Sequence, residues 1–256
     1  MGDIVTMDDL TNQEIVAVLD DAERLVPVAK GDVYLPLLQG KVLANMFFEN
    51  STRTRMSFET AMKRLGGSVL NFTSIGTSVA KGETLYDTMQ MIDGYADVAA
   101  IRHPRQGAAQ YSADAVEIPI LNAGDGAGNH PTQTMLDLFT IRQAHGTLEG
   151  LNVVLVGDLR YGRTVHSLSH ALVRFGAKLT LVSPSTLKMP VEIVTDLREH
   201  GSEIMETESL EDQIAGADVI YVTRIQKERF PDEDEYAKVA GIYKIEASDL
   251  SGAMKG

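Results

Sequence analysis

Cysteine and tryptophan are both absent from this chain of 256 residues. Without cysteine, the chain can form no disulfide and no thiolate metal site, which fits a reducing compartment. Long apolar runs are also absent, since no stretch approaches the roughly 20 residues needed to cross a membrane. The first 21 residues are acidic and lack the basic start and apolar run of a signal peptide. We therefore expect a cytoplasmic protein without a membrane anchor.

Positive charge is scarce as well. The chain has 23 lysines and arginines against 36 aspartates and glutamates, giving a formal net charge of −13. This balance argues against a broad nucleic-acid-binding surface, because such surfaces need a basic patch. Segments in which arginine or lysine do gather are therefore the places to look for a site that binds small anions.

Apolar, strand-like runs alternate with segments of helical periodicity along the chain. The strands are expected at 42–48, 68–72, 97–101, 118–121, 152–156, 178–182, 203–206 and 218–223. One helix is expected to begin at residue 11, and the others are expected at 54–65, 83–95, 108–114, 135–146, 163–175, 191–200 and 210–215. This pattern predicts an α/β fold with two doubly wound domains, each a mostly parallel sheet flanked by helices. The linker 147–150 would separate domains 1–146 and 151–256, with the active site in the cleft between them, at the carboxyl ends of the strands.

The most informative stretch is Ser51-Thr52-Arg53-Thr54-Arg55, which follows a strand and opens a helix. Backbone N–H groups at a helix start have no intrahelical partner, and the helix dipole favours an anion there. Hydroxyls and guanidinium groups at the same place suit a phosphate. The alternative is that Ser51 or Thr52 simply caps the helix and that the arginines are solvated.

Three further segments supply candidate partners for an anion. The loop before the helix at 83–95 contains Ser78 and Lys81, although a solvated surface loop is an equal interpretation. Arg102 ends a strand, where sites of α/β proteins usually lie. The glycine-rich segment 122–133 ends in His130-Pro131-Thr132-Gln133, and Pro131 suits a first helical turn. His130 and Gln133 would then face the same cleft.

The segment Gly157-Asp158-Leu159-Arg160-Tyr161-Gly162-Arg163-Thr164 nearly spells a nucleotide-binding P-loop. However, Arg163 stands where the lysine belongs, and no later strand ends in a convincing magnesium-binding aspartate. An alternative use is that Arg163 binds a carboxylate at the helix start. Arg224 and Gln226 follow another strand, so two arginines could hold the two carboxylates of a small dicarboxylic acid.

Taken together and in this order, these segments resemble the aspartate/ornithine carbamoyltransferase superfamily and, within it, the catalytic chains specific for aspartate. The resemblance covers essentially the whole chain. The stretch Thr223-Arg224-Ile225-Gln226-Lys227-Glu228-Arg229 is similar to the aspartate enzymes, because ornithine enzymes carry a different loop there. The implied activity is transfer of the carbamoyl group of carbamoyl phosphate to L-aspartate in de novo pyrimidine biosynthesis, without a metal or other cofactor.

The resemblance also implies a role for each candidate residue. Domain 1–146 would bind carbamoyl phosphate and domain 151–256 aspartate. The residues expected to hold carbamoyl phosphate are Ser51, Thr52, Arg53, Thr54, Arg102, His130 and Gln133, with Ser78 and Lys81 entering from a neighbouring subunit of a homotrimer. Arg53, Thr54, Arg102 and His130 are expected to be catalytic. The residues expected to hold aspartate are Arg163, Arg224 and Gln226. A separate regulatory chain is left open as a partner.

Family members continue beyond the point where this chain stops, at Gly256, with a segment that contacts both substrates and a returning helix. We therefore expect an incomplete aspartate site and weak or no activity. Three alternatives remain open: a non-catalytic scaffold of the same fold, a carbamoyltransferase for another amino acid, and a P-loop NTPase.

Overall fold

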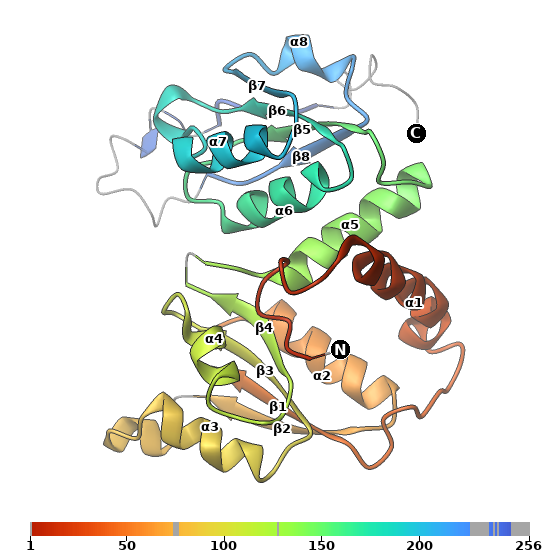
Figure 1. Ribbon diagram of the computed structural model, residues 1–256, viewed down its shortest axis with the longest axis vertical. Helices are drawn as coiled ribbons and strands as arrows, with labels where there is room; N and C mark the ends of the chain where they lie inside the picture. Colours follow the sequence, from red (N-terminus) through yellow and green to blue (C-terminus); the bar gives the residue numbers. More distant parts are fainter. Residues whose placement is uncertain are drawn as a thin grey trace. The chain divides into compact units, whose positions relative to one another are not determined.

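The computed structural model describes residues 2–73, 77–126, 128–225, 236, 237, 239 and 241–246. The chain divides into two compact units, Met1–Met135 and Leu136–Gly256. Each unit contains one four-stranded parallel sheet with helices on its faces (Figure 1). The predicted α/β class and the two doubly wound sheets are thus confirmed. Within the described residues, no helix is both long and apolar enough to span a bilayer.

The first unit follows the predicted alternation. Its elements are α1 (Asn12–Lys30), β1 (Val42–Phe47), α2 (Thr52–Arg64), β2 (Ser68–Thr73), the 3₁₀ helix η1 (Ser78–Lys81), α3 (Leu85–Asp93), β3 (Val98–His103), α4 (Ala108–Ala113), β4 (Ile120–Asp125) and α5 (Pro131–His145). The strand order is β2-β1-β3-β4. Helix α5 begins in this unit and continues into the second.

Both faces of the first sheet are apolar because its strands are covered on both sides. Alternate residues of β1 point in opposite directions. Leu43 packs with Met62 of α2, whereas Met46 packs with Met89 of α3. The outer edge of β4 is covered by the N-terminal segment, where the Ile4 N–H donates to the Ile120 carbonyl oxygen at 2.8 Å. This pairing closes an otherwise open sheet edge.

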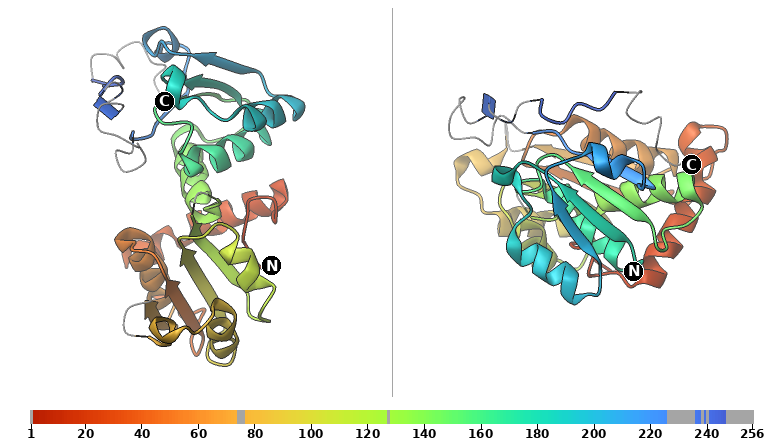
Figure 2. Two further views of the ribbon diagram at one scale, coloured as in Figure 1. Left: turned by 90° about the vertical axis from the view of Figure 1, so that its left-hand side faces the viewer. Right: turned by 90° about the horizontal axis from the view of Figure 1, so that it is seen from above.

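The second unit repeats the plan. Its elements are β5 (Asn152–Val156), α6 (Arg163–Val173), β6 (Lys178–Val182), the 3₁₀ helix η2 (Ser185–Leu187), α7 (Val191–Glu199), β7 (Ile204–Thr207), α8 (Glu211–Ile214) and β8 (Val219–Val222). The strand order is β7-β6-β5-β8. Further views show the parallel strands of each sheet and the helices beside them (Figure 2). Buried Val154 and Val156 pack with Ile214 of α8 on one face.

Several element boundaries differ from the predictions, and two of these differences concern segments that carry candidate residues. The strand expected at 118–121 instead begins at Ile120 and continues through the polar residues to Asp125. It continues because the side chain of Asn122 is satisfied internally, donating from Nδ2 to the Val5 carbonyl oxygen at 2.9 Å. The expected loop before α3 contains the short helix η1, which ends at Gly82.

Candidate functional site

The sheet order places the candidate residues of the first unit at a topological switch point. The chain runs from β1 outward to β2, then crosses to the other side of β1 for β3, so the connections from β1 and β3 leave in opposite directions. A crevice forms outside the carboxyl ends of strands at such a point. Phe47 pairs with Arg102 in the register, and the Phe48 N–H donates to the Arg102 carbonyl oxygen at 2.9 Å. The segment 51–55 therefore follows, after a few residues, the strand end that pairs with Arg102.

The start of α2 is open to an anion. Ser51 is the N-cap residue in an extended conformation, but its side chain makes no capping hydrogen bond, so the capping alternative does not hold for its hydroxyl. The first N–H groups of this helix are the donors that a helix start offers to an anion. Thr52 and Arg53 are exposed, and Thr54 is half-buried.

Arg102 is largely buried, with 12% of its side chain exposed. Its Nη2 donates to Glu49 Oε1 and its Nη1 to the Ala123 carbonyl oxygen, both at 3.3 Å. These distances are longer than usual for charge-assisted hydrogen bonds, and its buried Nε has no hydrogen-bond partner among the residues that the structure describes. A buried donor without a partner needs an explanation. An anion bound at this strand end would supply the missing acceptor.

His130 is held at the start of α5 by a buried network around Asp125. The Asp125 carboxylate accepts hydrogen bonds from the N–H groups of Gly107 at 2.8 Å and Asn129 at 2.7 Å. The ring Nδ1 of buried His130 lies 3.3 Å from Thr132 Oγ1. Asp125 thus orients the loop that carries His130. Sequence reasoning overlooked Asp125 and Glu49, since neither forms a motif by itself.

The remaining residues assigned to carbamoyl phosphate take different places in the first unit. Gln133 is half-buried in the first turn of α5. Ser78 and Lys81 are exposed on η1, which follows β2, the neighbour of β1 at the sheet edge. Arg53 also borders a cavity of about 610 Å³ between α1 and α2. The other side chains around that cavity are mainly apolar, which does not suit a phosphate.

The second unit has a matching switch point between β5 and β8. The chain runs from β5 outward through β6 and β7, then returns to the other side of β5 for β8. Arg163 is the first residue of α6, which follows β5, and exposed Arg224 comes two residues after the end of β8. The Thr223 N–H donates to the Val156 carbonyl oxygen at 2.8 Å, which joins the two strand ends. Gln226 lies outside the described residues.

The loop from Gly157 to Arg163 is unlike a polyphosphate cradle. Asp158 is fully buried within it, and its Oδ1 accepts a hydrogen bond from the Tyr161 N–H at 2.9 Å. A carboxylate enclosed by this loop would repel a nucleotide's phosphates and opposes the P-loop alternative. Arg163 opens the helix, where its guanidinium can instead meet a carboxylate.

Gly157 has a steric role at the switch point. Its φ of +117° favours glycine, and a Cβ there would collide with the Thr223 carbonyl oxygen. We predict that Gly157→Ala destabilises the protein by about 2–4 kcal/mol, because backbone strain and a backbone clash combine. Gly176→Ala is the matched control, since Gly176 has a φ of +72° and open space around it. If urea unfolding shows that Gly157→Ala and Gly176→Ala lower the free energy of unfolding equally, the clash at Gly157 has no effect.

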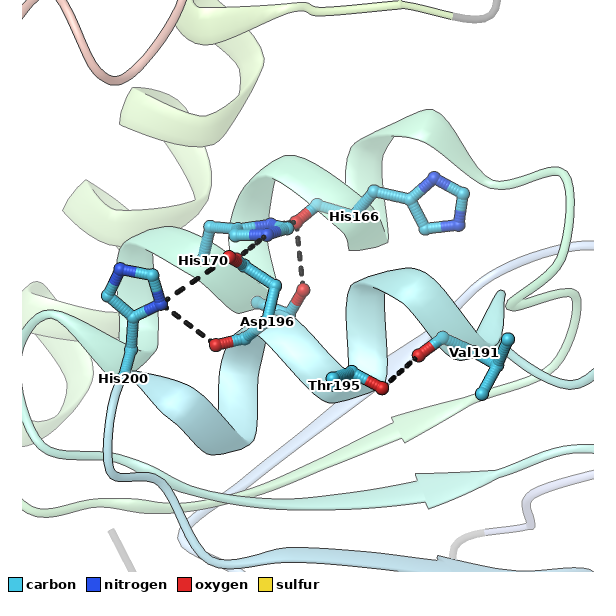
Figure 3. A network of polar contacts seen from close by, with 7 residues as sticks. His166, His170, Val191, Thr195, Asp196 and His200 are labelled. Atoms are coloured by element: carbon cyan, nitrogen blue, oxygen red, sulfur yellow. Dashed lines mark hydrogen bonds and ion pairs between the residues drawn. The ribbon is translucent and has the colours of Figure 1, made fainter.

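His166 joins the loop to the first turns of α6. Its Nε2 lies 2.7 Å from the Leu159 carbonyl oxygen, and its ring points away from the His170–Asp196 pair between α6 and α7 (Figure 3). Burial lowers the pKa of His166, and the charge of His170 adds to this, while Asp158 and Glu192 act in the opposite direction. The neutral ring is therefore the native form and donates from Nε2.

This lowered pKa predicts a pH effect on stability. The unfolded chain takes up the proton at an ordinary pKa of about 6.5, while the folded chain resists it. The stabilisation is therefore complete above that pH and is lost as pH falls through it towards the lower pKa of the native state. We expect the free energy of unfolding to fall less between pH 7 and 5 in His166→Gln than in the unchanged protein. His145→Gln is the control, and parallel profiles for His166→Gln and the unchanged protein would contradict the prediction.

Comparison with known proteins finds similarity over nearly the whole chain. Residues 2–143 match the model of the aspartate/ornithine carbamoyltransferase carbamoyl-P binding domain, and residues 149–255 match that of the Asp/Orn binding domain. The aspartate carbamoyltransferase catalytic subunit of Methanococcoides burtonii is 56% identical over 98% of this chain and 81% of its own length. That of Methanothermobacter thermautotrophicus is 52% identical over 97% of this chain and 80% of its own length.

Solved structures give the same result. The catalytic subunit of the M. jannaschii aspartate transcarbamoylase has a TM-score of 0.92 at 49% identity, covering 98% of this chain and 83% of that one. The Trypanosoma cruzi aspartate transcarbamoylase, solved in complex with carbamoyl phosphate and aspartate, has a TM-score of 0.92 at 40% identity. That alignment covers 99% of this chain and 83% of the other.

Proposed function

Because the chain belongs to the aspartate/ornithine carbamoyltransferase family, we propose that it is an aspartate carbamoyltransferase, which transfers the carbamoyl group of carbamoyl phosphate to the amino group of L-aspartate. The observation that carries this proposal is the pair of switch points. One gathers Arg102 and the open start of α2, and the other gathers Arg163 and Arg224. An acidic chain thus brings several of its few cations to strand ends suited to small anions.

The chemistry at the first switch point follows from its donors. The uncharged amine of aspartate attacks the carbonyl carbon, and negative charge develops on the carbonyl oxygen before phosphate leaves. Arg102, His130 and Thr54 would stabilise that oxygen, because donors fixed where charge develops lower the barrier. Arg53, together with the hydroxyls of Ser51 and Thr52 and the first N–H groups of α2, would hold the phosphate. Gln133 would contact the carbamoyl end.

The second switch point supplies the acceptor's binding groups. Arg163 and Arg224 would each hold one carboxylate of aspartate through paired donors, and Gln226 is assigned to the same substrate. A basic side chain in the substrate, such as that of ornithine, would meet two like charges there. An enzyme that holds both reactants in the reactive orientation converts a bimolecular reaction into an effectively unimolecular one. In well-oriented cases this lowers the activation free energy by roughly 7–11 kcal/mol.

The proposal extends to the assembly and the pathway. Ser78 and Lys81 would complete the carbamoyl phosphate site of a neighbouring copy, so the working form would be a homotrimer. Their exposure on η1 supports this assignment. A mass of one chain by light scattering, at concentrations where activity is seen, would refute the trimer. We place the reaction in the cytoplasm, as the committed step of pyrimidine synthesis, and leave open a separate regulatory chain.

The experiment that tests the function is an assay for N-carbamoyl-aspartate, with aspartate and ornithine as competing acceptors. We expect N-carbamoyl-aspartate, even if at the low rate anticipated from the sequence, no product from ornithine, and no product at all when carbamoyl phosphate is withheld. Product from ornithine instead would favour a carbamoyltransferase for another amino acid. No product from either, with intact carbamoyl phosphate binding, would indicate a chain that keeps its site without turnover. No binding at all would favour the scaffold.

A further inference from the structure

The hydroxyl of Tyr221, in β8, connects helix α5 with the start of α6. Tyr221 belongs to none of the sequence motifs described above. Tyr221 lies in β8, and its hydroxyl donates to Asp137 Oδ2 on α5 at 3.2 Å. The side chain of Thr164, in the first turn of α6, also interacts with this hydroxyl. The Tyr221 hydroxyl therefore links residues of β8, α5 and α6.

The surroundings of the Tyr221 hydroxyl keep it protonated. Burial is the main cause that raises the pKa of Tyr221 to about 12, and the Asp137 charge adds to it, while the bond from Thr164 opposes it. Tyr221 donates to Asp137. The phenol therefore stays neutral well above neutral pH.

The position of each member connects this arrangement to the site. Thr164 directly follows Arg163, so a contact that fixes Thr164 also fixes the backbone from which Arg163 extends. Asp137 lies four residues after Gln133 in α5, which places the two on the same helical face. Tyr221 pairs with Leu155 of β5 and is three residues before Arg224. Tyr221 is thus connected to both segments of the second unit that carry arginines assigned to aspartate. It is connected to Arg163 through Thr164, and to Arg224 along the chain.

We propose that Tyr221 is a positioning residue for the acceptor substrate: by bridging Thr164 and Asp137, it holds the first turn of α6 so that Arg163 meets a carboxylate of aspartate. The inference rests on the proposed function and goes beyond it, because it assigns a role to a residue that contacts neither substrate. Substrate-binding arginines need such support, since a displacement of about 1 Å can cost 10²-fold in rate.

The test is Tyr221→Phe, which removes one oxygen atom and keeps the ring. Tyr243→Phe is the matched control, because the Tyr243 hydroxyl donates to the Glu208 carbonyl oxygen at 3.1 Å in the same unit. We expect Tyr221→Phe to raise KM for aspartate about tenfold, from the loss of a hydrogen bond to a charged group. It should change KM for carbamoyl phosphate by less than about twofold. For each substrate, the ratio of the variant's KM to that of the unchanged protein should be constant from pH 6 to 9.

A second variant separates positioning from general stability. Thr164→Val removes the other end of the bridge, and the double variant should be no worse for aspartate than Tyr221→Phe alone, because members of one network are not additive. Equal aspartate KM values for Tyr221→Phe and Tyr243→Phe would overturn the inference, as would equal rises in both KM values with a matching fall in Tm. If the unchanged protein forms no N-carbamoyl-aspartate, the proposed function fails and the inference falls with it.

Discussion

Replacing Arg102 with methionine should lower kcat/KM for carbamoyl transfer by about 10³-fold or more. Two losses combine in this variant. One oxyanion donor alone is worth roughly 10²–10³ in kcat, and the charge that holds the phosphate is lost as well. The buried Nε, which has no partner within the described part of the chain, is the atom best placed to gain from a bound anion.

Arg105→Met is the matched control for this prediction. Arg105 lies three residues further along the chain, just after the end of β3, and is exposed, so its loss should change the rate less than about twofold. Arg102→Lys keeps the charge but not the planar fork and should fall between the two. Because Arg102 also donates to Glu49 and Ala123, Tm must be measured for each variant. An Arg102→Met protein with unchanged Tm and nearly full activity would refute the assigned role.

Arg163→Met should raise KM for aspartate by about 10²-fold while leaving carbamoyl phosphate binding within about twofold. A charged hydrogen bond contributes roughly 1.5–3 kcal/mol, and each 1.4 kcal/mol corresponds to a factor of ten in affinity. The effect should be selective because Arg163 belongs to the second switch point, whereas carbamoyl phosphate is assigned to the first.

The control here is Arg160→Met. Arg160 is exposed, lies over the ring of Tyr161 at 5.2 Å and belongs to the same loop, so it reports on loop damage without loss of a substrate contact. Initial-rate measurements at saturating carbamoyl phosphate give KM for aspartate directly. If Arg160→Met and Arg163→Met raise that KM equally, Arg163 has no special place in the aspartate site.

Much of the fold could be predicted because local signals and tertiary structure agree. The first helix was predicted to begin at residue 11, and α1 begins directly after Thr11, which forms a capping box with Glu14. The strand and helix around residues 51–55 were predicted because apolar runs there change period at a clear boundary. The parallel arrangement follows from alternation alone.

The extent of β4 could not be predicted, because its last residues have the composition of a loop. Asn122 and Asp125 remain in the strand only through partners distant in sequence, such as the Val5 carbonyl oxygen and the Gly107 N–H. The Asp137–Tyr221 contact is equally invisible in the sequence, since 84 residues separate the two. Motifs therefore indicated which residues could bind anions. The residues that orient those side chains could be identified only from the structure, because their partners are distant in sequence.

Binding of carbamoyl phosphate at the first switch point underlies every role assigned to the residues around it. Isothermal titration of carbamoyl phosphate into the unchanged protein, Arg102→Met and Arg105→Met tests this without requiring turnover. We predict one molecule bound per chain, affinity about 10²-fold weaker in Arg102→Met, and no change in Arg105→Met. No binding to the unchanged protein, or equal affinity in all three, would contradict the account.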